Sequence, residues 1–328
     1  MILRTLKSNS AVNFILFPLV AVIFWLKSLL EPVVYPFYRG ETENLLYRPV
    51  AQLLQNSAFL QSLASLLLII LMAFLVLQIN NRYSFIRVRT MLPAPLFVIL
   101  IGGFTQLHTL HPVYFATVFY LIAIFRFFSA FGKTKPYTAL FDTGIWLGVA
   151  SLFYFNAIIL LPAFLIGAGI LTRETRWREF VILITGVFVP FILAFGFAFY
   201  TNHLLELLKI LELNIVTPNN YLKGNIALQA FLGFLVLFTL LGSVKLLQQY
   251  NTKKVSTRKF FTVFFFLFLF SVFSFVFIPA TSQEMLMIIA IPATFQISNF
   301  FVFLKSRFWG ELLFSLLFVI VIALQFFS

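Results

Sequence analysis

The sequence contains no cysteine, a single aspartate and few charged residues of any kind. Only 10% of its 328 residues are Asp, Glu, Lys or Arg, whereas about a quarter is usual in a soluble domain. The absence of cysteine excludes a disulfide-stabilised secreted domain and a cysteine-ligated zinc site. A hydrophobic content of 62% excludes a disordered regulator and a cytosolic enzyme of ordinary composition. The chain is therefore expected to be a membrane protein.

Sequence motifs of several common chemistries are missing as well. The chain has no GxSxG motif, no P-loop, no GxGxxG fingerprint and no HExxH motif. It lacks RNP and C2H2 patterns, although its formal net charge is +13 from 23 Lys and Arg against 10 Asp and Glu. In a membrane protein this surplus sets orientation, because basic residues collect in cytoplasmic loops. We expect no nucleic-acid partner and infer no cofactor.

Apolar runs long enough to cross about 30 Å of hydrocarbon recur along the chain. They lie at residues 11–30, 58–79, 179–200, 226–244, 260–278, 285–304 and 311–327. Two further segments, 91–129 and 143–171, each predict a pair of shorter helices. The expected fold is an all-α, polytopic transmembrane bundle with about 11 crossings, forming a single integral membrane domain over residues 1–328.

The segment 143–171 is too long for one upright helix, and it has basic residues on both sides. Lys133 and Lys135 precede it, and Arg173 and Arg176 follow it. A chain turn at Tyr154 would return the segment to its starting side, and both basic flanks would then face the cytoplasm. We therefore predict a hairpin of two short helices at 143–171.

The basic residues also predict the orientation of the whole bundle. With the N-terminus inside and the C-terminus outside, most Lys and Arg residues fall on the cytoplasmic side. The outer side then holds only Lys27, Arg39, Arg48, Lys209 and Lys223.

Two outer-face connections, residues 31–57 and 202–225, are longer than simple turns. In the first, Leu46, Val50 and Leu54 recur at helical spacing. In the second, Glu206, Lys209 and Glu212 recur every three residues, and a leucine precedes each of them. Each connection is predicted to carry an amphipathic helix lying in the membrane interface.

Phenylalanine and glycine are unevenly represented, with 47 Phe against 14 Gly. This ratio favours helix contacts made by aromatic packing over small-residue seams of the GxxxG kind. Polar groups within the spans, such as Gln296 and Asn299, are expected to form hydrogen bonds between helices. The near absence of ionisable residues at depth argues against an ion-coupled transporter.

The three histidines, His108, His111 and His203, all fall on the predicted outer face. They are candidate metal ligands, and Glu284 or a glutamate of the first outer loop would complete the shell. The alternative is that they cap helix ends.

Three glutamates of the first outer loop, Glu31, Glu41 and Glu43, are the candidate catalytic residues. One of these carboxylates would act as a general base toward an acceptor hydroxyl. The alternative is a solvated loop in which they cap helices.

The order of a first span, an outer loop with an amphipathic helix and a pair of short helices resembles the GT-C glycosyltransferases. Residues 144–163, with small residues, an aromatic turn and Leu-Leu-Pro, are the closest part. The resemblance covers residues 10–200 and implies a polyprenyl-phosphate-linked donor and an acidic residue in the first outer loop. The acidic residue of GT-C enzymes is often an aspartate, whereas Asp142, the one aspartate here, is predicted to lie inside. Glu31, Glu41 and Glu43 match by position but not by motif.

The whole chain is more similar to an uncharacterised family of Phe- and Leu-rich polytopic bacterial inner-membrane proteins. The similar stretches are residues 140–154, 177–179 and 289–292. This resemblance implies a bacterial cytoplasmic (inner) membrane and no assigned activity.

Two functions remain open at this point, and the sequence leaves open whether the protein is an enzyme. The first is a non-catalytic integral subunit or scaffold of a cell-envelope or protein-export assembly, with membrane lipids and other integral membrane proteins as partners. The second is a GT-C-type transferase that uses a polyprenyl-phosphate lipid on the outer face.

Overall fold

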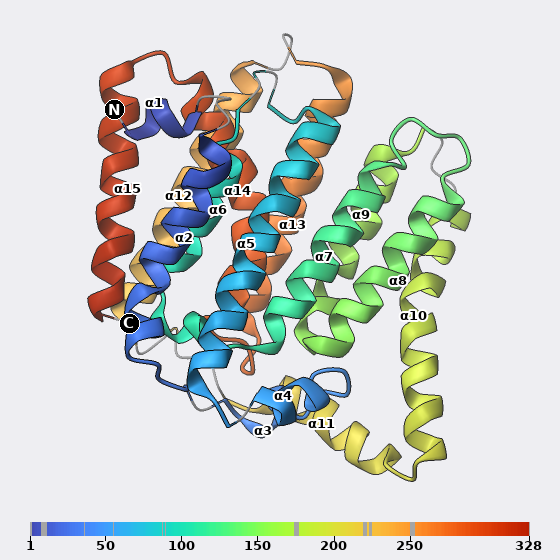
Figure 1. Cartoon of the computed structure of the whole chain (residues 1–328). Helices are drawn as coiled ribbons and strands as arrows, with labels where there is room; N and C mark the ends of the chain where they lie inside the picture. Colours follow the sequence, from blue (N-terminus) through green and yellow to red (C-terminus); the bar gives the residue numbers. More distant parts are fainter. Residues whose placement is uncertain are drawn as a thin grey trace.

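The computed structural model describes residues 2–327, except 8–11, 36, 55, 87, 89, 174–176, 219–221, 223–224 and 250–252. Two of the basic residues discussed above, Arg176 and Lys223, lie outside the described residues. Within the described part the chain is helical and has no strand, which confirms the all-α prediction (Figure 1).

Among the described residues, seven helices are long and apolar enough to cross a membrane. They are α2 (Asn13–Leu30), α5 (Ala58–Tyr83), α10 (Trp177–Tyr200), α12 (Ile226–Gln248), α13 (Val255–Phe277), α14 (Met285–Phe303) and α15 (Arg307–Phe327). Shorter apolar helices are α6 (Pro93–Gly102), α7 (Pro112–Phe128), α8 (Tyr137–Phe153) and α9 (Leu161–Leu171). The remaining elements are α1 (Ile2–Lys7), α3 (Arg39–Thr42), α4 (Arg48–Leu54), α11 (Leu204–Val216) and the 3-10 helices η1 (Thr105–His108) and η2 (Phe155–Leu160). The chain is thus a membrane protein, as expected.

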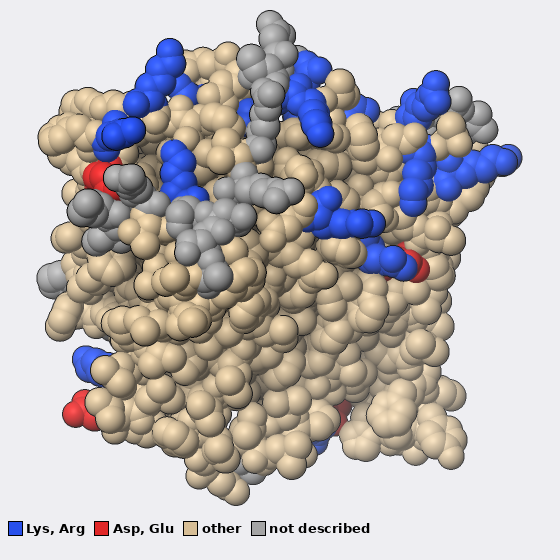
Figure 2. Space-filling model, turned by 45° about the horizontal axis from the view of Figure 1, so that its top comes forward, with Lys and Arg blue, Asp and Glu red and all other residues tan. Residues whose placement is uncertain are grey.

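The long and short apolar helices run between two ends of the bundle (Figure 1). One end, here called the loop end, contains α3, α4 and α11. The C-terminal ends of α15 and α6 also meet there, where the Gln325 side chain donates to the Gly102 carbonyl (2.7 Å). At the other, here called the basic end, α1 meets the end of α14 where Lys7 donates to the Val302 carbonyl (2.6 Å). Lys and Arg side chains gather around the basic end (Figure 2). The number of crossings and the compartment that each end faces stay predictions.

The segment 143–171 folds back on itself. Helix α8 ends at Phe153, η2 makes the turn, and α9 begins at Leu161 with Pro162 in its first turn, where a proline costs no hydrogen bond. The amide of Gly132, just before α8, donates to the carbonyl of Leu171 at the end of α9 (3.1 Å). Both basic flanks of the segment therefore lie at the same end of the bundle.

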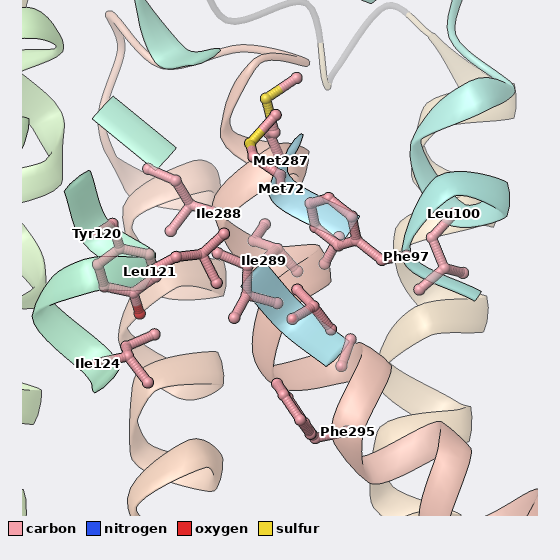
Figure 3. Close-up of a cluster of buried hydrophobic side chains, with 14 of the residues drawn as sticks. Met72, Phe97, Leu100, Tyr120, Leu121, Ile124, Met287, Ile288, Ile289 and Phe295 are labelled. Atoms are coloured by element: carbon pink, nitrogen blue, oxygen red, sulfur yellow. The ribbon is translucent and has the colours of Figure 1, made fainter. Parts of the chain in front are cut away.

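Helix α14 forms the centre of the bundle and is buried along nearly its whole length. Its Met287, Ile288 and Ile289 pack against side chains of α5, α6 and α7, including Met72, Phe97 and Leu121 (Figure 3). In lipid such contacts stabilise by close packing rather than by removing apolar surface from water. The last residues before α14 are thereby fixed at the loop end.

Aromatic packing dominates one part of the core, as the composition predicts. The ring of Phe85 has its centroid 5.0–5.3 Å from those of Phe128, Phe260, Phe264 and Phe295. Polar groups also link helices here. Ser243 of α12 donates to Gln296 of α14, and Lys253 donates to Asn299 (2.8 Å).

Helices α8 and α10 contact each other through glycines rather than through aromatic side chains. A methyl group at Gly144 would lie 2.3 Å from the carbonyl oxygen of Leu183, and one at Gly186 would lie 2.4 Å from that of Phe141. The two backbones approach so closely that only glycine fits at both positions. This pair is an exception to the prediction that aromatic packing outweighs small-residue seams, because that prediction rested on the total number of glycines and not on their positions.

Helices also occur in both long loop-end connections. Within 31–57 the structure has α3 and α4, and within 202–225 it has α11. Helix α11 turns Leu207, Ile210 and Asn214 into the protein, while Leu205 is 82% exposed. Whether α4 and α11 lie in the membrane interface stays a prediction.

Candidate active site

The three glutamates of the first connection occupy three different environments. Glu31 follows the last turn of α2 and is exposed. Glu41, on α3, is 1% exposed. Glu43, just after α3, is half-buried and lines a pocket between α4, α10 and α11. The predicted set therefore does not form one site, and only Glu41 points into the protein.

The three histidines are also kept apart. His108 is buried, its ring stacked on Trp25 with centroids 4.0 Å apart, and its Nδ1 lies 2.7 Å from the Ser28 hydroxyl. His203 is exposed at the start of α11. His111 is 1% exposed and faces Glu41. Among the described residues no three His, Asp or Glu side chains are grouped to hold a metal ion.

Four side chains from four elements meet inside the loop end: Glu41, His111, Tyr154 and Glu284, here called the acid–histidine cluster. His111 Nε2 lies 3.4 Å from Glu41 Oε1. The Tyr154 hydroxyl donates to Glu284 Oε1 over 3.1 Å. The rings of His111 and Tyr154 meet edge to face with centroids 5.9 Å apart, which joins the two carboxyl groups into one cluster.

Each member is positioned by a helix end. His111 caps α7, where its Nδ1 accepts from the Val113 amide (3.1 Å). Because Nδ1 accepts, the neutral ring carries its proton on Nε2, which lies 3.4 Å from Glu41 Oε1. Glu284 precedes α14 and accepts from the Ser282 amide (2.6 Å). Tyr154 follows the last residue of α8 in an extended conformation.

Helix α11 holds α3 over the cluster. Asn214 donates to the carbonyl of Gly40 (2.9 Å) and to the side-chain oxygen of Asn44 (3.2 Å). A methyl group at Gly40 would lie 2.4 Å from the Tyr38 ring, so the closeness of the packing accounts for glycine at this position. On the other side, the hydroxyl of Tyr47 donates to the Leu110 carbonyl next to His111 (2.9 Å).

Burial shifts the pKa of both carboxyl groups and of the imidazole. It raises the pKa of Glu41 to about 8, although a hydrogen bond from the Tyr38 backbone opposes the rise. Burial, followed by the nearby charge of Glu41, raises the pKa of Glu284 to about 7, against the effect of His111. Burial lowers the pKa of His111 to about 4, with Glu284 acting in the opposite sense. In each case the charged form is disfavoured because it loses solvation.

The cluster is consequently close to neutral at pH 7 and holds exchangeable protons. Glu41 is mostly protonated, Glu284 is near its midpoint and His111 is an uncharged donor. Two carboxyl groups that titrate near neutral pH suit general acid–base chemistry. Such groups are costly to bury, and in a membrane protein they commonly mark a functional site.

Part of this cluster was predicted from the sequence, which indicated two of its members as candidate site residues. These were Glu41 and His111, whereas Glu284 was named only as one of several partners for a metal shell. Tyr154 entered only as a turn residue, and Asn214 was missed. One signal available in the sequence was that Glu284 directly precedes the predicted span at 285–304, where an unpaired carboxylate would be costly.

These features define an all-helical membrane protein with an acid–histidine cluster buried at its loop end. The chain belongs to DUF6427, a family of unknown function, whose model matches residues 44–328. The match includes His111, Tyr154 and Glu284 and begins after Glu41. No curated protein and no solved structure matches the chain.

Proposed function

We propose that the protein is a membrane transferase of the GT-C type that works at its loop end and takes its donor from a polyprenyl-phosphate lipid. The acid–histidine cluster is the observation that carries this proposal. A raised pKa makes the Glu41 carboxylate a stronger base than an ordinary glutamate. About a tenth of Glu41 is ionised at pH 7 if its pKa is about 8.

In the proposed reaction an acceptor hydroxyl attacks the anomeric carbon of the donor. The new C–O bond forms as the bond between that carbon and the phosphate oxygen breaks. Glu41 takes the proton of the acceptor, and polyprenyl phosphate leaves as the anion. His111 Nε2 lies 3.4 Å from Glu41 Oε1 without a hydrogen bond between them; in the reaction it turns its N–H onto the carboxylate and orients it. Because Glu41 is only 1% exposed, α3 has to move for a substrate to reach it.

The test uses membrane vesicles from a host strain that lacks the gene and carries a plasmid copy. They are incubated with a polyprenyl-phosphate-linked hexose labelled in the sugar, and transfer of label to membrane acceptors is measured. Glu41→Gln is expected to abolish transfer while the protein level stays normal. The matched control is Glu212→Gln, an exposed glutamate on α11, which should retain the wild-type rate. Full transfer by Glu41→Gln would refute the proposal.

A second candidate is the integral subunit or scaffold of a cell-envelope or protein-export assembly. The observation that favours it is that solvent does not reach the cluster, since Glu41 and His111 are each 1% exposed. A closed polar cluster also suits a structural link between α3, α7, α8 and α14. Purification in mild detergent separates the two candidates. Stoichiometric membrane partners and a functional Glu41→Gln variant support the subunit, whereas a protein isolated without companions contradicts it.

We further propose that the protein resides in the bacterial cytoplasmic membrane with its basic end inside. The gathering of Lys and Arg around that end supports this orientation (Figure 2). The loop end and its cluster would then face the outer side.

A further inference from the structure

A pocket of about 410 Å³ opens at the loop end between α4, α10 and α11. This volume is within the range of small-molecule sites. The pocket is separate from the acid–histidine cluster, but the two share a wall. Glu41 faces the cluster, while Glu43, two residues further along the chain, lines the pocket. On α11, Asn214 holds α3, and Ile210, one turn earlier, lines the pocket.

The polar wall of the pocket is rich in hydrogen-bonding groups and carries an excess of negative charge. It is formed by Glu43, Arg48, Gln52, Thr201, His203 and Glu206. Arg48 Nη1 donates to Glu206 Oε1 over 3.3 Å, so the one guanidinium is already paired within the pocket. A phosphate or carboxylate group would compete with Glu206 for Arg48 and would meet a second carboxylate at Glu43. An anionic ligand is therefore disfavoured.

Hydroxyl groups fit this wall better than any anion. Each hydroxyl donates one hydrogen bond and accepts others. Carboxylates and the amide oxygen of Gln52 accept from such groups, while Arg48 and the Gln52 nitrogen donate to them. Hydrogen bonds with a charged partner are the stronger ones, so carboxylates are good partners for a polyhydroxylated ligand.

The rest of the lining is apolar, and it continues onto the exposed side of α10. Phe197 lines the pocket and is 61% exposed, and Tyr200 at the end of the same helix is 85% exposed. Exposed aromatic side chains at the end of a spanning helix are typical of the membrane interface. A ligand with a polar head in the pocket has room for an apolar chain along α10.

We infer that this pocket binds the uncharged, polyhydroxylated head group of a glycolipid, with the lipid chains lying along α10. This inference rests on the proposed function, because a hydroxyl group of the bound lipid would become the acceptor once α3 moves and opens the way from the pocket to Glu41. It adds the class of acceptor and assigns its binding to residues outside the acid–histidine cluster.

The experiment measures binding to the full-length protein in nanodiscs of phosphatidylcholine, by native mass spectrometry. The probes are a monoglucosyl diacylglycerol, phosphatidylglycerol as an anionic lipid, and free maltose as a sugar without a lipid. The glucosyl lipid is expected to bind more tightly than either of the other two. Equal or tighter binding of phosphatidylglycerol would overturn the inference, as would absence of glucolipid binding. Binding of maltose as tight as that of the glucolipid would refute the role of α10.

Variants locate the site. Glu206→Gln and Gln52→Leu are expected to weaken glucolipid binding about tenfold, whereas Glu212→Gln, on the same helix as Glu206, leaves it unchanged. Phe197→Ala should weaken glucolipid binding without affecting maltose. Unchanged affinity in all three pocket variants would place the lipid elsewhere and refute the inference.

Failure of this inference is distinguishable from failure of the proposed function. The Glu41→Gln variant is expected to bind the glucolipid normally and to lose transfer. Normal binding together with full transfer in this variant refutes the proposed function and leaves the binding of the glycolipid in the pocket standing. Absence of binding in a wild-type protein that transfers sugar refutes only the pocket.

Discussion

Replacement of Glu41 by glutamine tests the buried carboxyl group without any knowledge of the substrate. Burial raises the pKa of Glu41 from its ordinary value of 4.5 to about 8. Between these two pH values the folded protein holds a proton that the unfolded chain has released. Folding stability contributed by this group is therefore complete below pH 4.5 and is lost as the pH rises toward 8.

The magnitude follows from the same two values. In the middle of the window the free energy of unfolding falls by about 1.4 kcal/mol per pH unit. Over the whole window the loss approaches about 5 kcal/mol. Glutamine is nearly isosteric with the protonated acid and does not titrate, so Glu41→Gln should remove this part of the pH dependence.

The assay is thermal unfolding in detergent, followed by tryptophan fluorescence from pH 5 to pH 9. Wild type and Glu41→Gln are expected to have similar melting temperatures at pH 5, and the variant should be the more stable of the two at pH 9. A smaller decline remains in the variant because Glu284, with a pKa of about 7, still titrates. Adding Glu284→Gln should flatten the curve further.

The exposed residue Glu212 provides the control, since Glu212→Gln should follow the wild-type curve at every pH. The reasoning is refuted if Glu41→Gln declines with pH as steeply as wild type. A large loss of stability in Glu41→Gln already at pH 5 would also contradict it, because the native side chain is uncharged there.

Three further predictions concern the rest of the molecule. Gly186→Ala places a methyl group 2.4 Å from the Phe141 carbonyl oxygen and should lower the free energy of unfolding by about 1–3 kcal/mol, measured by thermal unfolding. Gly196→Ala on the same helix, with nothing within 4 Å, should not destabilise the protein. Equal effects would contradict the close contact of α8 and α10. Tyr154→Phe removes the hydrogen-bond donor to Glu284 and should lower the free energy of unfolding by about 1–3 kcal/mol. The loss should be larger at pH 8 than at pH 5, because the charged carboxylate depends more on its donor, and the exposed Tyr200→Phe should leave stability unchanged. A loss independent of pH would count against the hydrogen bond to Glu284. The orientation of the bundle can be tested with engineered cysteines, because the chain has no native cysteine. In intact cells a thiol reagent that does not cross membranes should label Glu212→Cys and not Lys135→Cys. The reverse labelling pattern would mean that the proposed topology is inverted.

Local patterns predicted the helices well, because hydropathy and the positions of basic residues are properties of short segments. The break at Tyr154 is an example, since it follows from the length of one apolar run and the charges on its two sides. The close contact of α8 and α10 could not be predicted in the same way. Gly144 and Gly148 form a GxxxG pair within α8, which indicates a close helix contact. Gly186 belongs to a different helix, and nothing in the sequence identifies that helix as the partner.

The acid–histidine cluster depends on the same kind of long-range information. Glu41 and Glu43 are chemically alike and two residues apart, so the sequence treats them as equivalent loop glutamates. They differ because Asn214, from a distant part of the chain, holds Gly40 and Asn44 and thereby turns Glu41 inward. The burial of Glu41 is in turn what raises its pKa. If the link from Asn214 sets this orientation, Asn214→Ala should expose Glu41 and return its pKa toward 4.5, and the melting temperature of that variant should then depend less on pH than that of wild type.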